Sequence, residues 1–377
     1  MKNIILFPTK YADINERLKA IKPDQYGKTR NFVDGAVSQL SPYISRGVIS
    51  TRQVLNLVLQ TEDIKSYSVY KFIQELAWRD FFQLVYRALG DNIFKDITYK
   101  QPHAKYKQIP AAVYNATTGI QALDELINTF YETGYMHNHV RMYTASVTCS
   151  VGKTYWLQPS RWLYYYLLDG DIASNTCSWQ WVAGSFSWKQ YFCDQNYINR
   201  YTHTSQAETF LDVPYPDLVK MDVPEVLKKH IILKLLTPLP ETKQPVIDTK
   251  LPTLVYNSYN LDPLWRAKEK ANRILLLEPS HFKKFPVGQK VVDFIIALSG
   301  NIAGLQIFTG EIKAITLIYK KAGATEPPII SKEHPSCTHY PGTKDERDWM
   351  FPEITGFHKS YHSYWKKADK ILKEMKP

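Results

Sequence analysis

The stretch Asp169-Gly-Asp-Ile-Ala-Ser-Asn-Thr-Cys-Ser-Trp-Gln-Trp181 determines how the rest of the chain is interpreted. Two acids, one amide and two indoles lie within these thirteen residues, directly after the aromatic run Trp162–Tyr166. Tryptophan and tyrosine at helical spacing usually belong to a hydrophobic core. Acids and amides do not, because a buried polar group costs free energy unless it is paired. The combination predicts a site between helices that holds a flat and polar molecule.

A second segment, from Tyr135 to Trp156, is compatible with a single helix. On that helix Asn138, Arg141 and Met142 share one face, because residues three and four apart are neighbours on a helix surface. An amide, a guanidinium and a thioether on one face favour contact with something polar and something flat. We expect this face to line the same site.

Four motifs and one amide resemble those of the photolyase and cryptochrome flavoproteins: Gly134-Tyr-Met-His-Asn138, Arg141-Met142, Asp169-Gly-Asp171, Trp179-Gln-Trp181, and Asn175. Two motifs further upstream agree in order and spacing, so the resemblance covers roughly residues 20 to 190. It implies a mainly α-helical domain that holds FAD noncovalently in a folded shape. It also implies that near-UV or blue light drives electron transfer from the flavin. Whether an antenna pigment binds stays open.

The resemblance gives the polar residues roles around the flavin. Asp169 would pair with Arg141 beneath the ring, which keeps a necessary charge inside at tolerable cost. Asn175 would face flavin N5, where a neutral amide accommodates either a bare or a protonated nitrogen. Asp171 would bind the cofactor as well.

Two tryptophans match an electron chain that reduces the flavin from outside. Trp179 and Trp156 would be its first two stations. The third tryptophan of the family is absent, since its place falls near His103. Tyr106 or Tyr99 would have to substitute for it.

A helix predicted over residues 69–89 carries further site residues. From spacing alone, Glu75 and Arg79 would form a surface ion pair worth roughly a few tenths of a kcal/mol. The resemblance instead places Glu75 and Trp78 in the pocket for damaged DNA, and Arg79 near the flavin together with Phe72.

A second helix is expected to begin at Ser41-Pro42, with the Ser41 hydroxyl at the N-cap and Pro42 at the first helical position. Free amides at a helix start bind phosphate groups, although most such caps bind nothing. The resemblance places the FAD diphosphate here, with these residues as contacts: Tyr26, Ser38, Gln39, Leu40 and Ser41. Val37 stands where the family usually has threonine, which removes one side-chain hydrogen bond.

The resemblance gives the damaged DNA flat or soft walls: Trp78, Trp181 and Met142. Asn138 and Met142 stand where enzymes for the (6-4) photoproduct carry histidines, so the pattern is similar to the cyclobutane-dimer class. His139, a further substrate-site residue, stands where the family often has arginine.

Two functions follow from the resemblance. One is light-driven repair of cyclobutane pyrimidine dimers in DNA, a deoxyribodipyrimidine photolyase activity, which the retained Glu75 and Trp78 favour. The other is a cryptochrome-type photoreceptor without repair. Tyr135 in place of the family's tryptophan, the altered segment Trp188–Arg200 and the missing third indole favour the receptor. A flavin-free DNA-binding protein is a third option, which a colourless purified sample would select.

The composition favours a polyanionic partner such as DNA, because the formal charge is +11 and the excess of Lys and Arg is spread over both halves. Four cysteines without a CxxC pair argue against a disulfide scaffold or a metal site and favour a reducing cytoplasm. No apolar run reaches the length of a membrane span, and Met1–Pro8 is too short for a signal peptide. We expect a cytoplasmic monomer.

The pattern changes after residue 205. Residues 206–252 contain seven prolines and are interpreted as a linker with one helix, Pro224–Leu236. In residues 253–377, short apolar runs alternate with helical segments, one of them at residues 288–298, which predicts a small Rossmann-like α/β domain with a parallel sheet. Residues 1–205 would then form the all-helical domain that binds FAD and DNA.

Photolyases normally carry an α/β domain at the amino end, where it holds an antenna chromophore. The run Leu254–Asp262 is weakly similar to the opening of that domain. A rearranged domain order is therefore one interpretation, and an unrelated α/β appendage is the other. The last predicted helix, His358–Met375, is amphipathic and basic.

Overall fold

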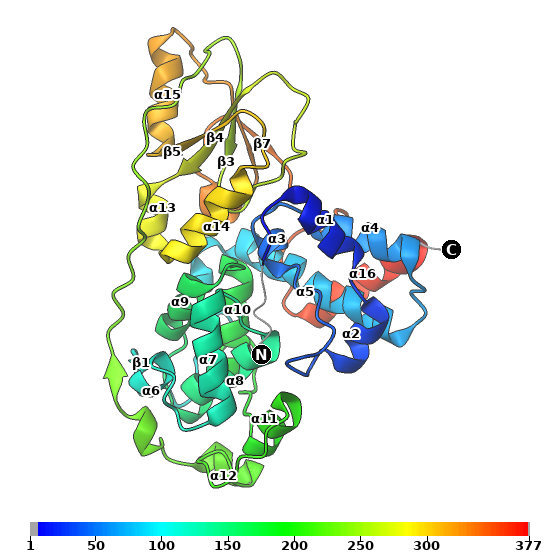
Figure 1. Ribbon diagram of the computed structural model, residues 1–377, viewed down its shortest axis with the longest axis vertical. Helices are drawn as coiled ribbons and strands as arrows, with labels where there is room; N and C mark the ends of the chain where they lie inside the picture. The colour runs from blue at the N-terminus through cyan, green and yellow to red at the C-terminus, as the bar shows by residue number, and fades with distance from the viewer. Residues whose placement is uncertain (1–6, 376–377) are drawn as a thin grey trace. The chain divides into compact units, whose positions relative to one another are not determined.

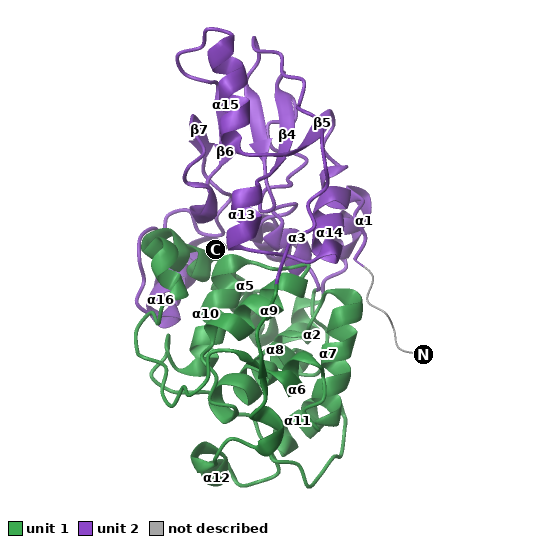
Figure 2. Cartoon of the chain, turned by 90° about the vertical axis from the view of Figure 1, so that its left-hand side faces the viewer, with its two compact units in different colours: residues 1–6, 22–38, 62–234 green, residues 7–21, 39–61, 235–377 purple. Residues whose placement is uncertain are grey.

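The computed structural model describes residues 7–375 and forms two compact units (Figures 1 and 2). The helical unit comprises residues 22–38 and 62–234, and the α/β unit comprises residues 7–21, 39–61 and 235–375. The mainly helical fold followed by a parallel sheet toward the carboxyl end is confirmed. The expected division at residues 205 and 252 stays a prediction. The compact units differ from it, because residues 7–21 and 39–61 belong with the sheet.

The helical unit contains nine α-helices among its described residues: α2 (Pro23–Thr29), α5 (Tyr67–Leu89), α6 (Ala111–Tyr114), α7 (Gln121–Thr133), α8 (Asn138–Ala145), α9 (Leu157–Tyr166), α10 (Ile172–Ala183), α11 (Gln195–Thr202) and α12 (Tyr215–Lys220). A 3₁₀ turn follows α5 (Gly90–Phe94) and another covers Glu225–Leu227. Two short strands, β1 (Ile109–Pro110) and β2 (His230–Ile231), pair antiparallel. Helices α7 to α10 lie side by side in Figure 1.

Buried apolar side chains from α7 to α10 make up one hydrophobic core, which includes Ile127, Phe130, Tyr143, Trp162 and Trp179. The predicted helix over 69–89 is confirmed as α5. Helix α7 ends at Gly134, whose φ of 70° is the left-handed conformation that favours glycine at a helix terminus.

The segment Tyr135–Trp156 is not one continuous helix. Helix α8 begins at Asn138, and from Ser146 to Val151 the chain forms a π-helical turn. The hydroxyls of Thr144 and Thr148 donate to carbonyl oxygens four residues earlier, at 2.8 and 2.6 Å. Such bonds compete with the helical ladder and bend helices. Trp156 therefore precedes α9 as its N-cap residue and does not lie on α8.

The α/β unit is built on a parallel sheet of five strands in the order β5-β4-β3-β6-β7. The strands are β3 (Thr253–Tyr256), β4 (Asn272–Leu277), β5 (Leu305–Thr309), β6 (Ile329–Lys332) and β7 (Thr343–Asp345). The helices are α1 (Tyr11–Lys19), α3 (Ser41–Ser45), α4 (Thr51–Thr61), α13 (Pro279–Lys284), α14 (Gln289–Ser299), α15 (Ile312–Lys321) and α16 (Tyr361–Met375). Strand, helix and strand alternate as predicted, and α15 shares a core with β3, β4 and β5.

The α3 segment packs against the loop after β3 within this unit. The carbonyl of Arg46 accepts from Leu261 N at 2.9 Å, and its buried guanidinium donates to Ser258 O at 3.4 Å. A side chain at Gly47 would meet Tyr259 O at 2.4 Å. These contacts explain why residues 39–61 belong with the sheet.

Two local predictions were wrong. The N-cap of α3 is Leu40 and not Ser41, and Pro42 is the second helical residue. The helix expected over 224–236 is only the turn Glu225–Leu227, followed by β2. Strand β2 pairs with β1, so the chain satisfies its backbone groups across strands.

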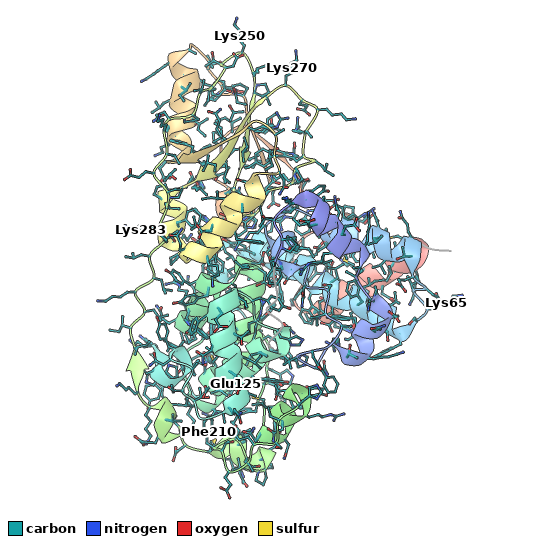
Figure 3. All side chains as sticks on the ribbon, in the orientation of Figure 1. Lys65, Glu125, Phe210, Lys250, Lys270 and Lys283 are labelled. Atoms are coloured by element: carbon teal, nitrogen blue, oxygen red, sulfur yellow. The ribbon has the colours of Figure 1, made fainter. Side chains whose placement is uncertain are left out.

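Figure 3 labels exposed lysines in both units, including Lys65, Lys250 and Lys270, so positive side chains are found well apart along the chain. All four cysteines are buried and form no disulfide. Residues 7–375 contain no cluster of His, Cys, Asp or Glu suited to a metal ion. Over the same residues, none of the helices combines the length and apolar character needed to cross a bilayer. Most of Met1–Pro8 lies outside the described residues.

Candidate functional site

Helix α10 is the shared element of the site, since it packs against α5, α8 and α9. Asp171 caps its amino end and accepts a hydrogen bond from Ser174 N at 2.6 Å. The Gln83 amide of α5 donates to the other oxygen of the same carboxylate. Asp171 is buried, so these donors replace the water that its charge loses. They also fix α10 against α5.

Arg141 of α8 holds Asp169, which lies in the loop between α9 and α10. Arg141 Nη2 donates to the two carboxylate oxygens at 3.0 and 2.9 Å, and Nε donates to Met136 O at 2.8 Å. The Asp169 side chain is 2% exposed and that of Arg141 is 25% exposed. The pair predicted from the sequence is therefore present.

Asn175 lies one turn into α10. Its amide nitrogen donates to Ser160 O of α9 at 2.9 Å. Within the part of the chain that the structure describes, its Oδ1 receives no hydrogen bond. Two neighbouring buried oxygens, Ser174 Oγ and Gln83 Oε1, also have no partner there. Orphaned polar atoms at one helix end indicate that a further polar group belongs beside them.

Glu75 of α5 does not pair with Arg79 as its spacing suggested. Its Oε1 lies 3.0 Å from Lys71 Nζ and 3.3 Å from Arg30 Nη1. Lys71 lies four residues before Glu75, and Arg79 four residues after, so helical spacing alone could not choose between them. Arg30 follows α2 and could not be predicted from local sequence.

Tyr26 lies close to Glu75 in the same unit. Burial, followed by the negative charge of Glu75, raises the pKa of the Tyr26 phenol. The Tyr26 ring packs edge-on against Phe72 at a centroid distance of 5.1 Å. The phenol therefore remains a neutral hydrogen-bonding group at physiological pH.

The residues predicted to contact substrate differ in exposure. Asn138 is exposed and its Nδ2 lies 3.9 Å from Met142 Sδ. Trp181 is 37% exposed. Trp78 is half-buried, with its ring 5.7 Å from Phe81 and 5.2 Å from Phe82.

His139 is buried, in contrast to Asn138 beside it. Its ring packs against Tyr143 and Tyr201 at centroid distances of 6.1 and 6.0 Å. Burial, followed by the positive charge of Arg30, lowers the pKa of His139 to about 4. It is therefore neutral at physiological pH and faces the interior of the helical unit.

Trp179 and Trp156 are both buried. The Trp156 indole donates to Asp96 Oδ1 at 2.8 Å, and Trp156 N donates to Gln101 Oε1 at 3.0 Å. Sequence reasoning missed Asp96 and Gln101, because they lie in a connection without periodicity. It also passed over Gln180, between the two indoles of α10, which binds that connection at Ile93 O and Ile97 N.

The expected diphosphate segment is divided between the units. Ser38 belongs to the helical unit, and Gln39, Leu40 and Ser41 belong to the α/β unit. Gln39 has a φ of 52° and accepts from Arg17 Nη1 at 3.1 Å. Helix α3 has only five residues, so its amino end is too short to form an anion site by itself.

Comparison with known families identifies the region built around α10. Residues 72–239 match the family described as the FAD binding domain of DNA photolyase. This region, which is less than half of the chain, is therefore similar to a photolyase-type FAD-binding domain. The match contains most of α5 and all of α8, α9 and α10, and the matched family binds FAD. Tyr26 and residues 38–41 lie outside the matched region.

Curated relatives of this chain include photolyases and cryptochromes. The deoxyribodipyrimidine photo-lyase of Alkalihalophilus pseudofirmus is 33% identical over 162 residues, 42% of this chain and 34% of the relative. The cryptochrome DASH of Natronomonas pharaonis is 30% identical over 194 residues, 49% of this chain and 41% of the relative. The chain thus spans about a third to two fifths of these relatives. The Synechocystis cryptochrome structure aligns over 60% of this chain and 49% of its own, with 22% identity and a TM-score of 0.47.

The polar groups around α10 fit FAD. The Arg141 guanidinium neutralises Asp169, so a flat ring near this pair would meet no net buried charge. The Asn175 carbonyl offers an acceptor, and the orphaned oxygens of Ser174 and Gln83 offer more. An isoalloxazine edge carries donors and acceptors that such groups satisfy.

Proposed function

We propose that this protein repairs cyclobutane pyrimidine dimers in DNA, using light absorbed by FAD. The proposal rests mainly on two helices that pack against α10 and carry side chains of different kinds. Helix α8 supplies Arg141 to the Asp169 pair, and helix α5 presents Glu75 and Trp78. The Arg141–Asp169 pair suits a flavin, and Glu75 and Trp78 suit the damaged bases. When bound, FAD supplies the electron that splits the dimer under near-UV or blue light.

Within the helical unit, the cofactor would be held by these residues: Tyr26, Ser38, Phe72, Arg79, Arg141, Asp169, Asp171 and Asn175. The Asn175 amide is oriented by its bond to Ser160 O, so its Oδ1 would accept a hydrogen bond from a ring N–H of the cofactor. Asp171 is committed to the α10 cap and to Gln83. We therefore propose that Asp171 acts mainly by fixing the position of α10.

The damaged bases would contact Glu75, Trp78, Asn138, Met142 and Trp181. Both cations approach Glu75 Oε1, and Oε2 is the atom that we propose to accept hydrogen bonds from flipped bases. The two indoles and the thioether provide flat or soft contacts. His139 is buried, so we propose that it supports Asn138 from inside the helical unit and does not touch DNA itself.

Trp179 and Trp156 would carry the electron that reduces the flavin before repair. Both indoles are buried, which shields them from solvent. The Asp96 carboxylate stabilises positive charge on the Trp156 indole through its hydrogen bond.

A photoreceptor without repair activity is the alternative. Tyr191 of the altered segment lies against Trp181, at a centroid distance of 6.1 Å. The Tyr191 ring narrows the space beside Trp181, which is one proposed wall of the substrate site. The curated relatives include cryptochromes as well as photolyases.

The test is a comparison of flavin content and dimer repair in Glu75→Ala, Glu75→Gln and Glu125→Ala. Glu125 is an exposed carboxylate of α7, labelled in Figure 3. We expect both Glu75 variants to retain flavin and to lose repair, with the smaller loss in Glu75→Gln because its amide keeps an acceptor oxygen. Glu125→Ala should match the parent protein. Unchanged repair in Glu75→Ala would remove Glu75 from the substrate site.

A further inference from the structure

The end of helix α11 packs against residues 30–38, the segment that follows α2. The carbonyl of Tyr201 accepts from Val33 N at 3.0 Å. The Phe32 ring lies edge-on to the Tyr201 ring at a centroid distance of 5.0 Å and stacks on His203 at 5.3 Å. Backbone and ring contacts therefore join two segments that lie far apart in the sequence.

A polar pair closes the same junction. His203 Nε2 lies 3.0 Å from Asp34 Oδ1. The hydrogen bond with His203 lowers the pKa of Asp34, so the carboxylate stays ionised. His203 ends α11 with a φ of 56°, a left-handed conformation that histidine and asparagine adopt more often than most residues. The side chains of His203 and Asp34 are 55% and 70% exposed, so both can be replaced without opening the core.

Two other helices hold the segment 30–38 as well. Thr29 Oγ1, at the end of α2, accepts from Ala36 N at 2.9 Å. A side chain at Gly35 would meet Thr29 O at 2.0 Å, so the backbone passes close to α2. Arg30 Nη1 lies 3.3 Å from Glu75 Oε1 of α5. The segment is thus held by α2, α5 and α11 together.

Helix α11 is itself well supported within the helical unit. Ile198 is fully buried in the core that α7 to α10 share. The Tyr197 ring lies edge-on to Tyr143 of α8 at 5.9 Å and to Tyr201 at 4.7 Å. The residues that contact the segment 30–38 therefore stand on a helix anchored to the core.

We propose that His203 and Asp34 are positioning residues, which hold the segment 30–38 so that Ser38 can contact the diphosphate of FAD. The inference rests on the proposed function, because it needs Tyr26 and Ser38, on either side of the segment, to bind that diphosphate. A segment that is already ordered loses less conformational freedom when a ligand binds, and the ligand binds more tightly. The pair therefore acts on the diphosphate half of the cofactor and not on its ring.

The experiment measures equilibrium binding of FAD, and of riboflavin, which lacks the diphosphate, to the flavin-free full-length protein. The variants are His203→Asn, Asp34→Ala and the two together. His103→Asn is the matched control, because His103 is exposed and has the same φ of 56°. We expect FAD affinity to fall about three- to tenfold in each single variant. The double variant should match the weaker single variant, since both changes remove one contact. Riboflavin affinity should be unchanged in all of them, and the control should match the parent protein.

Other results separate this inference from the proposed function. Unchanged FAD affinity in His203→Asn would overturn the inference. Equal losses of FAD and riboflavin affinity would overturn it too, because they would show a general loosening of the helical unit. A parent protein that binds FAD but repairs no dimers would contradict the proposed function alone, since comparing FAD with riboflavin would still decide the role of His203. A parent protein that binds no FAD would overturn both.

Discussion

Arg141 Nη2 lies 2.9 and 3.0 Å from the two carboxylate oxygens of Asp169, a side chain that is 2% exposed. The two residues lie on different elements, α8 and the loop before α10, so the pair joins them. Removing one partner of a buried pair leaves an uncompensated charge, which is far more costly than the net value of the pair.

Arg141→Ala should therefore destabilise the protein by about 3–5 kcal/mol and greatly reduce its FAD content. Urea unfolding and the flavin absorbance per protein measure the two effects. Arg161→Ala, which removes an exposed arginine of α9, is the matched control and should change neither. Equal behaviour of the two variants would show that the pair is not needed.

Two buried histidines predict loss of stability in acid. Burial lowers the pKa of His137 to about 3 and that of His139 to about 4, from 6.5. Both are neutral when folded and take up protons on unfolding below pH 6.5. Their contribution is fully present above pH 6.5 and is lost as the pH falls toward 4 and 3, with a slope of about 1.4 kcal/mol per pH unit for each proton.

His139→Phe, which keeps a ring against Tyr143 and Tyr201, should reduce this slope by about one proton. Urea unfolding at pH 7, 6 and 5 measures it. His103→Asn is the control, because His103 is exposed and asparagine accepts its positive φ. The same slope in His139→Phe and the parent protein would contradict the prediction.

Gly27→Ala tests the close approach of α2 to α5. Alanine ordinarily stabilises a helix by about 0.5–1 kcal/mol relative to glycine. Here the new Cβ would lie 2.5 Å from Ser68 Cα, a backbone atom that cannot move aside cheaply. We expect a net loss of about 1–3 kcal/mol in unfolding free energy. Lys28→Ala, at the exposed next position, should be near neutral, and a gain in Gly27→Ala would rule out the contact.

Trp179→Phe should slow photoreduction of the flavin, because this step needs the indole as an electron donor. Repair by chemically reduced protein does not need it and should stay intact. Trp188→Phe alters a tryptophan that is 80% exposed and should have no effect on either. Steady illumination with a reductant, followed by a repair assay, measures both steps. Equal photoreduction rates in the parent protein and Trp179→Phe would exclude this indole from the route.

Much of the fold could be predicted, because segments with a strong apolar period follow the helix and strand preferences of their own residues. The apolar pattern of α5 and the short apolar strands of the parallel sheet follow from helix and strand preferences. The helix expected at 224–236 failed because β2 pairs with β1, more than a hundred residues earlier in the chain. The neighbouring sequence does not indicate such a long-range strand pairing.

The site was predicted only where residue types left few alternatives. A buried carboxylate needs a cation to offset its charge, and Arg141 does pair with Asp169 as expected. Glu75 had cations at equal spacing on both sides, and its partners depended on α2 as well. Asp96 could not be predicted from the sequence, because its role depends on a hydrogen bond with Trp156, sixty residues away.

The central claim is light-driven repair by an FAD-bound protein. The most direct measurement is to illuminate the purified, reduced protein with blue light in the presence of DNA that contains cyclobutane dimers, and to quantify intact dimers against a dark control. We predict that dimers disappear only in the light, while total DNA and net flavin oxidation state are unchanged. A flavin that responds to light while every dimer persists would contradict the claim and favour the photoreceptor.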